Sequence, residues 1–111
     1  MNYNIHITDK AETDIQDAAD YIEFVLLNPE SADQLLDEAD EEINSLSFMP
    51  AKHQLVEDPV LASWGIQMIP VKNYLAFYII DEPETVVHIV RFLCEKRNWV
   101  SILKREPISF D

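Results

Sequence analysis

The sequence predicts one α+β domain, residues 1–111, in which two N-terminal helices pack on an antiparallel sheet. Apolar residues recur at helical spacing in the first half of the chain, whereas strand-like apolar runs fill the second half. The only glycine, Gly65, lies where the pattern changes. With 111 residues, 48% of them apolar, the chain is long enough to bury one core. The expected order of elements is β-α-α-β-β-β-α.

The first half of the chain is expected to form a short strand and then a helical hairpin. Residues 3–7 alternate between apolar and polar side chains, which is typical of a half-buried strand. Thr8 or Asp9 can cap the first helix, and Asn28 followed by Pro29 can cap the second. Acidic residues lie off the apolar stripe of each helix. The stripes are Ala11, Ile15, Ala18, Ile22 and Val25 in the first helix and Ala32, Leu35, Leu36, Ala39, Ile43 and Leu46 in the second.

The second half is expected to begin with a connecting loop over residues 48–64, because helical periodicity stops there and two prolines interrupt the segment. Lys72-Asn73 then forms a tight turn in which Asn73 tolerates a positive φ. A second turn covers residues 81–84, and Asn98 can cap a last short helix. The expected strands cover Ile66–Val71, Tyr74–Ile80 and Thr85–Leu93.

The middle strand of these three is apolar throughout, with the sequence YLAFYII. A strand of this kind is covered on both faces, so Tyr74–Ile80 is expected at the centre of the sheet. The helical hairpin supplies the cover for one face. We expect this packing to involve Ile15, Ile22, Leu36 and Ile43.

The composition excludes several classes of site. A dinucleotide fingerprint or a P-loop needs more than one glycine, and a disulfide framework or a cysteine-based zinc site needs more than Cys94. His6, His53 and His88 are far apart in the sequence, so no metal site is expected. No cofactor is expected either. The N-terminal residues lack a secretory h-region, and no run is long enough to span a membrane. A reducing cytoplasm is the expected compartment.

Charge is distributed unevenly within the net charge of −13. Residues 1–50 hold thirteen acidic residues and one basic residue, which is a net charge of −12. This balance argues against nonspecific binding to nucleic acid, because that binding scales with the cations presented. A local cationic cluster near the C-terminus can still hold one or two phosphates. The cluster consists of Arg91, Lys96, Arg97, Lys104 and Arg105.

The segment from Gly65 to Trp99, GIQMIPVKNYLAFYIIDEPETVVHIVRFLCEKRNW, resembles the C-terminal half of RelE/ParE superfamily toxins from type II toxin–antitoxin modules. The shared features are a hairpin carrying VKNYLAFY, an acidic turn, and VVHIVRFL ending in basic residues before tryptophan. The first strand, the first helix and the helix after NPE also fit, so the resemblance covers about residues 1–104. It implies a toxin that either cleaves ribosome-bound mRNA or poisons DNA gyrase without cleavage, and that a cognate antitoxin holds silent.

The resemblance also implies candidate catalytic residues for a metal-independent endoribonuclease. Such cleavage needs a base, an acid and cations around the phosphate. Arg91 matches an arginine common in the family and could hold a phosphate bidentately. Lys96 and Arg97 match the paired basic residues before the tryptophan. Glu95 or Tyr78 could carry the proton. The favoured interpretation is therefore cleavage of ribosome-bound mRNA that inhibits translation.

Two departures from the family pattern keep other functions open. Where relatives often have arginine after the hairpin glycine, this chain has Gln67 and Met68, and where many have His-Gly, it has Cys94-Glu95. These departures favour a gyrase-directed toxin without catalysis, or a degenerate member that only binds an antitoxin or pairs with itself. For Arg91, the structural alternative is an ion pair with an acidic side chain of the helical hairpin.

Overall fold

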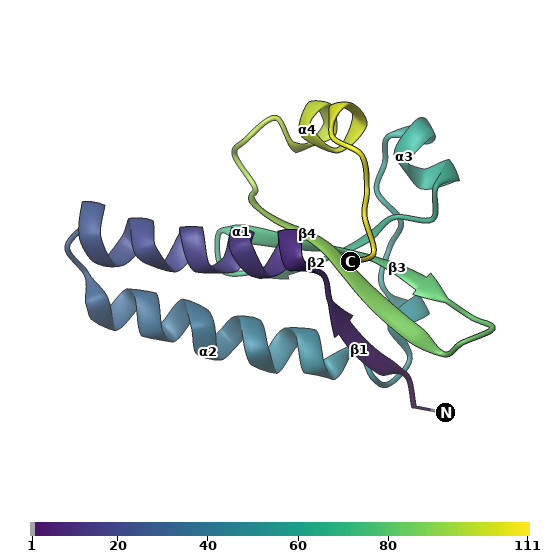
Figure 1. Ribbon diagram of the computed structural model, residues 1–111, viewed down its shortest axis with the longest axis horizontal. Helices are drawn as coiled ribbons and strands as arrows, with labels where there is room; N and C mark the ends of the chain where they lie inside the picture. Colours follow the sequence, from purple (N-terminus) through teal and green to yellow (C-terminus); the bar gives the residue numbers. More distant parts are fainter. Residues whose placement is uncertain (1) are drawn as a thin grey trace.

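The computed structural model describes residues 2–111, and Figure 1 shows a helical hairpin beside a twisted sheet. Helix α1 continues through a π-helical turn at Tyr21–Val25, and a 3₁₀ turn covers Pro50–Lys52. Within residues 2–111, no helix is both long and apolar enough to cross a membrane. The elements are β1 (Asn4–Ile7), α1 (Asp9–Asp20), α2 (Pro29–Ser45), α3 (Pro59–Ser63), β2 (Gln67–Val71), β3 (Tyr74–Asp81), β4 (Val86–Cys94) and α4 (Trp99–Arg105).

The four strands form one sheet in the order β1-β4-β3-β2. The three C-terminal strands are antiparallel, as expected, and β3 lies in the interior of the sheet. The first strand differs, because β1 runs parallel to β4 with Ile5 opposite Val87. The apolar alternation that predicted β1 carries no information about the direction of its neighbour, so this pairing was not predictable from it.

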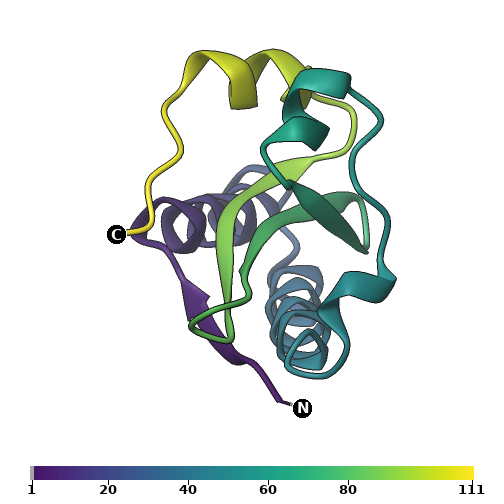
Figure 2. The ribbon, with the colours of Figure 1, turned by 90° about the vertical axis from the view of Figure 1, so that its right-hand side faces the viewer.

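Both faces of the sheet are covered, which confirms the expectation for the central strand. Ala76 and Tyr78 belong to the core beneath α1 and α2. Leu75 and Phe77 belong to a second core on the side of α3 and α4. Figure 2 shows the hairpin helices on one side of the sheet, with α3 and α4 above it. The strict alternation along β3 therefore divides its side chains between two cores.

The predicted helix caps are present. Thr8 Oγ1 accepts a hydrogen bond from Ala11 N–H at 3.2 Å, and Asn28 Oδ1 accepts one from Ser31 N–H at 3.1 Å. Asn98 caps α4 in the same way. These side chains satisfy backbone N–H groups that would otherwise lack partners in the first turn of each helix.

The predicted packing of the hairpin is confirmed for Ile43, which is buried, and for Ile15 and Ile22, which are half-buried against the same core. The prediction was wrong for Leu36, which lines a groove between α1 and α2, because Leu35 takes the buried position. The apolar stripe predicted for the first helix was wrong at its last residue, Val25, which is 62% exposed. The π-helical turn rotates the end of α1 away from a regular α-helical stripe.

Two local predictions need correction. The segment 48–64 contains α3 as well as the 3₁₀ turn, because Asp58 caps a helix that Pro59 begins. In the β2–β3 turn, Lys72 rather than Asn73 has the positive φ, at 52°.

Candidate functional site

Arg91, the residue predicted to hold a phosphate, is buried and paired with acidic side chains. It lies on β4 with 8% of its surface exposed. Its Nε donates to Asp14 Oδ2 at 2.6 Å, and its Nη2 donates to Asp14 Oδ1 at 3.3 Å. Its Nη1 lies 3.3 Å from Glu106 Oε1. The structural alternative for Arg91, an ion pair with the helical hairpin, is therefore confirmed.

Opposing effects act on the pKa of the Arg91 guanidinium. Burial lowers this pKa, whereas the hydrogen bond and charge of Asp14 and the charge of Glu106 raise it, and the net effect is a raised pKa. The guanidinium therefore stays charged, and its charge is balanced within the chain. Because carboxylates occupy the guanidinium, a phosphate would have to displace Asp14 or Glu106 to bind it bidentately.

Asp14 also completes one edge of the sheet. β1 covers β4 only as far as Ile89, whose carbonyl accepts hydrogen bonds from the backbone N–H and the hydroxyl of Thr8. Further along β4, Phe92 N–H donates to Asp14 Oδ2 at 3.0 Å. One carboxylate thus accepts two hydrogen bonds from Arg91 and one from the backbone. Sequence reasoning missed Asp14, because nothing in the pattern distinguishes it from the other acidic residues of the hairpin.

A β-bulge in β4 lies beside Arg91. The register with β3 shifts between Phe77, which is opposite Arg91, and Tyr78, which is opposite Ile89. Strict alternation would place Ile89 and Phe92 on opposite faces of the sheet, yet both pack in the core beneath the hairpin. The bulge therefore turns the Phe92 side chain to the same face as Ile89, beneath the hairpin that carries Asp14.

Tyr78 and Gln67 both hold the connecting loop on the sheet. Tyr78 is fully buried, and its hydroxyl donates to the Pro50 carbonyl at 2.8 Å. Burial raises the pKa of the Tyr78 hydroxyl far above its ordinary value. Gln67, one of the two residues that depart from the pattern the resemblance implies, donates a hydrogen bond from its side-chain amide to the His53 carbonyl. A buried hydroxyl that resists ionisation has no access to a substrate at the surface, so this geometry disfavours Tyr78 as a proton carrier.

Glu95, Lys96 and Arg97 lie together on the exposed turn between β4 and α4. Neither Lys96 nor Arg97 makes an ion pair with any residue in the range 2–111, whereas Lys104 contacts Asp58 at 2.9 Å. The cationic cluster of the sequence is therefore divided. Arg91 and Lys104 are used within the fold, and the turn carries cations that remain available to a partner.

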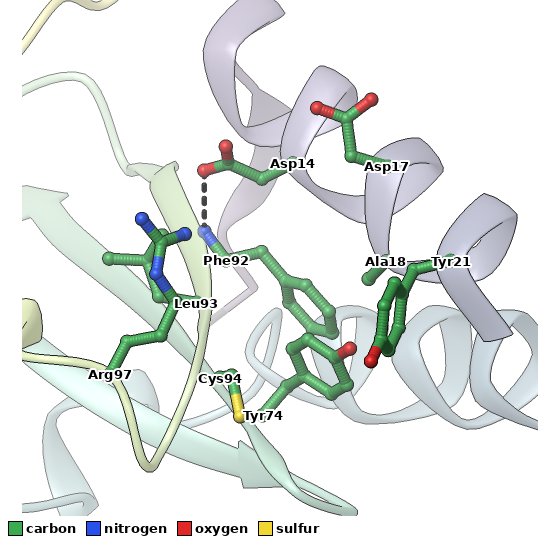
Figure 3. Close-up of a pocket in the computed structure, with 9 residues that line it drawn as sticks. All are labelled: Asp14, Asp17, Ala18, Tyr21, Tyr74, Phe92, Leu93, Cys94 and Arg97. Carbon is green, nitrogen blue, oxygen red and sulfur yellow. Dashed lines mark hydrogen bonds between the residues drawn. The ribbon is translucent and has the colours of Figure 1, made fainter. Parts of the chain in front are cut away.

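A groove with charged rims lies between α1 and the adjoining ends of β3 and β4 (Figure 3). The groove beside α1 has a volume of about 340 Å³, and it continues toward α2 into a second part of about 580 Å³. We refer to the two parts together as the central groove. Tyr74 stacks on Phe92 in its floor, with ring centroids 5.1 Å apart. The two parts share Tyr21, Tyr74 and Cys94.

The rims of the central groove differ in charge. Asp14 and Asp17 contribute acidic groups from α1, and Arg97 lines the same part of the groove from the opposite side. Lys72 and Lys96 line the part that continues toward α2. The groove thus offers an apolar floor with an acidic rim along the helix and a basic rim along the turns, which suits an extended segment of mixed charge.

Two of the three histidines, which are far apart in the sequence, lie close together in the fold. Because β1 pairs with β4, His6 Nδ1 lies 2.8 Å from His88 Nδ1, a distance that requires a shared proton. Across the described residues, no group of three or more histidine, cysteine, aspartate or glutamate side chains is arranged to hold a metal ion. His6 and His88 therefore form a hydrogen bond between β1 and β4.

Comparisons with known proteins agree with the fold and with the resemblance in the sequence. The model of the ParE toxin family, from the parDE type II toxin–antitoxin system, matches residues 5–99. The fold is similar to a chain of the chromosomal ParDE system from P. aeruginosa, with 19% identity, coverage of 83% of this chain and 95% of that chain, and a TM-score of 0.67.

A second similar fold occurs in the RelBE2 toxin–antitoxin complex from Mycobacterium tuberculosis, with 22% identity, coverage of 86% of this chain and 100% of that chain, and a TM-score of 0.58. No curated protein matches the sequence at a significant level. The family match covers most of the chain and includes all but the first residue of β1, the hairpin and strands β2 to β4. This chain therefore belongs to the ParE toxin family of type II toxin–antitoxin systems, within the RelE/ParE superfamily that its sequence resembles.

Proposed function

We propose that this toxin inhibits DNA gyrase by binding to it and does not cleave RNA. The observation that carries the proposal is the pairing of Arg91 with Asp14 and Glu106. An arginine whose fork is occupied by carboxylates is poorly placed to stabilise a phosphorane. The resemblance to the superfamily offers gyrase inhibition as the mode of action that needs no catalytic groups.

The distribution of the other candidate residues supports the same proposal. RNA cleavage without a metal needs an acid, a base and a cation that converge on one phosphate from an exposed face. Tyr78 is buried, and Glu95, Lys96 and Arg97 are consecutive on one turn. Consecutive side chains on a turn point in different directions, so this arrangement suits a binding surface better than a site that encloses a phosphate.

A direct test compares the two targets with the same purified toxin. We expect it to inhibit supercoiling by purified DNA gyrase and to leave ribosome-bound mRNA uncut in a cell-free translation reaction. Triple substitution of Glu95→Gln, Lys96→Ala and Arg97→Ala affects only exposed side chains and serves as the matched variant. New mRNA 5′ ends at ribosomes, without an effect on gyrase, would contradict the proposal.

One observation favours the nuclease as the second candidate. The exposed turn places Glu95 between Cys94 and the two free cations, so a proton carrier and phosphate-binding groups are neighbours. In that case the triple variant should fold normally and lose mRNA cleavage. The gyrase proposal instead requires that cleavage is absent already in the unsubstituted toxin.

We also propose that a cognate antitoxin covers the central groove. The two similar folds come from toxin–antitoxin systems, and the groove has the apolar floor on which a partner segment can lay its side chains. The charged rims predict an antitoxin segment of mixed charge, with acidic residues over Lys96 and Arg97 and basic residues beside Asp17. Arg91 lines neither part of the groove, because its guanidinium is paired with Asp14 and Glu106.

The salt dependence of association tests this proposal. Screening acts first on long-range attraction, so raising salt from about 50 mM to about 500 mM should slow association before it weakens the assembled complex. The protein encoded beside the toxin gene provides the partner for stopped-flow measurements. A rate that does not change with salt would mean that apolar contacts alone select the partner.

A further inference from the structure

The tip of the helical hairpin exposes a group of large apolar residues that extends beyond the central groove, with which it shares Tyr21 and Leu26. Five apolar residues between positions 21 and 27 have between 51% and 79% of their surface exposed. Exposed apolar side chains are ordinary when scattered, but a contiguous group of large ones marks an interaction site. We name this group the tip patch. It consists of Tyr21, Phe24, Val25, Leu26 and Leu27.

The backbone of the tip is shaped so that these side chains point outward. Leu26 N–H donates to the Tyr21 carbonyl across a π-helical turn, at 3.0 Å, and Asn28 N–H donates to the Ile22 carbonyl, also at 3.0 Å. The π-helical turn moves the end of α1 out of the buried stripe. The residues that follow Ile22 therefore extend beyond the part of the hairpin that packs on the sheet, as the free end of the hairpin in Figure 1 shows.

Leu27 is held in a conformation that its side chain disfavours. Its φ is 55°, in the left-handed region, at the position after a helix where glycine is common and asparagine is the usual substitute. It is also the most exposed residue of the tip patch, at 79%. Its side chain gains little from burial and is strained by the backbone, so packing within this chain does not explain a leucine at this position.

The charge around the tip patch identifies the chemistry of its partner. Acidic residues flank the patch along the chain, and no basic residue occurs between Lys10 and Lys52. An acidic rim attracts a cationic partner and repels a second hairpin tip or an anionic lipid surface. Lys72 and Lys96 line the same part of the central groove as Tyr21 and Leu26, and Lys72 is paired there with Glu38 at 3.2 Å. The acidic residues are Asp17, Asp20, Glu23, Glu30 and Asp33.

From these observations we propose that the tip patch is a docking surface for a basic, amphipathic helical segment of a partner protein. The apolar face of such a helix would cover Phe24 and Leu27, and its lysine or arginine side chains would contact the acidic rim. This inference does not rest on the proposed function, because it assumes neither gyrase nor an antitoxin as the partner.

Defined peptides test the proposal on the full-length toxin. The probe is a helical peptide of about 18 residues, or five turns, with leucine on one face and lysine on the other. A leucine/glutamate peptide and a glutamine/lysine peptide are the matched probes. We expect only the leucine/lysine peptide to bind measurably by fluorescence anisotropy. Equal binding of the glutamine/lysine peptide would show that charge alone attracts it, which would overturn the proposal.

Substitutions in the toxin separate docking from stability. Leu27→Gly removes both the side chain and the backbone strain, so the melting temperature should be unchanged or raised while peptide affinity falls by at least about tenfold. Phe24→Ser should weaken binding similarly, whereas Leu55→Ser, which removes an exposed apolar side chain elsewhere, should leave it unchanged. Undiminished binding by Leu27→Gly and Phe24→Ser would refute the assignment of the patch.

The same variants distinguish a basic helical partner from two other occupants of the tip patch, a membrane surface and a second copy of this chain. Binding of the unsubstituted toxin to phosphatidylcholine vesicles that is lost in Phe24→Ser would identify a membrane surface instead and would overturn the proposal. A sedimentation mass of two chains that returns to one in Phe24→Ser would identify self-association and would likewise overturn it. The absence of both, together with selective peptide binding, would support the proposal.

Discussion

The pairing of Arg91 with Asp14 leads to a quantitative prediction about stability. Asp14→Asn keeps an oxygen that can accept the Phe92 N–H, but it removes the charge that balances the guanidinium of Arg91, a residue with only 8% of its surface exposed. Leaving one member of a buried ion pair without its partner typically costs about 3–5 kcal/mol. Glu106 remains as a second partner, but its side chain is 48% exposed and the compensation it provides is screened by solvent. We therefore expect a loss of about 3 kcal/mol in the free energy of unfolding.

A double-mutant cycle with urea unfolding measures this effect. Asp14→Asn should lower the melting temperature by more than about 10 °C, because 1 kcal/mol corresponds to about 4–8 °C in a small domain. Arg91→Met alone should also destabilise, since it leaves the carboxylate of Asp14 buried with only the backbone donor. The double variant Asp14→Asn, Arg91→Met carries no buried charge, so its stability should return to within about 1.5 kcal/mol of the unsubstituted toxin.

The double variant also decides whether Arg91 has a functional role. Arg91→Ala alone cannot decide this, because it also removes the partner of the buried Asp14 carboxylate. If the double variant is as stable as expected and is still toxic when its expression is induced, Arg91 has a structural role only. If it is stable but no longer toxic, Arg91 acts on the target. A cost below about 1 kcal/mol for Asp14→Asn would refute the reasoning itself, because the pair would then behave as a surface ion pair.

Three further predictions concern groups that the fold uses. The pKa of Asp58 is lowered, first by the hydrogen bond from Lys104. The stability that Asp58 contributes to the fold is therefore present above its unfolded pKa of about 3.9 and is lost as the pH falls through the lower folded pKa. In Asp58→Asn, the free energy of unfolding should fall less steeply as the pH is lowered. Tyr78→Phe should cost about 1 kcal/mol in urea unfolding through the lost bond to Pro50 and leave toxicity unchanged. Glu106→Gln should shift stability by less than about 1 kcal/mol, because the side chain is half exposed.

Local signals in the sequence predicted much of the fold. Thr8, Asn28 and Asn98 are capping residues that act over a few positions, and all three cap the helices that they were expected to begin. The run of apolar residues in β3 likewise predicted a strand covered on both faces. In each case the physical cause lies within one turn or one strand, so a short stretch of sequence contains it.

The missed features depend on residues far apart in the chain. Asp14 and Arg91 are separated by 77 positions, and they meet only because the fold packs α1 against β4. His6 and His88 meet only because β1 joins the sheet parallel to β4. A pattern of charges along the sequence shows that Arg91 has potential acidic partners, but it cannot identify which of them the fold brings near.

The tip patch and the central groove meet at the hairpin, and this arrangement links their occupants. Tyr21 and Leu26 belong to the tip patch and also line the groove. A segment lying in the groove would therefore cover part of the surface that a helix on the tip needs, and two ligands that need the same side chains bind in competition. By linkage, each would weaken the other by the same factor. A partner on the tip would thus be excluded while an antitoxin fills the groove and admitted when the antitoxin is lost, which is the order of events that a silenced toxin requires.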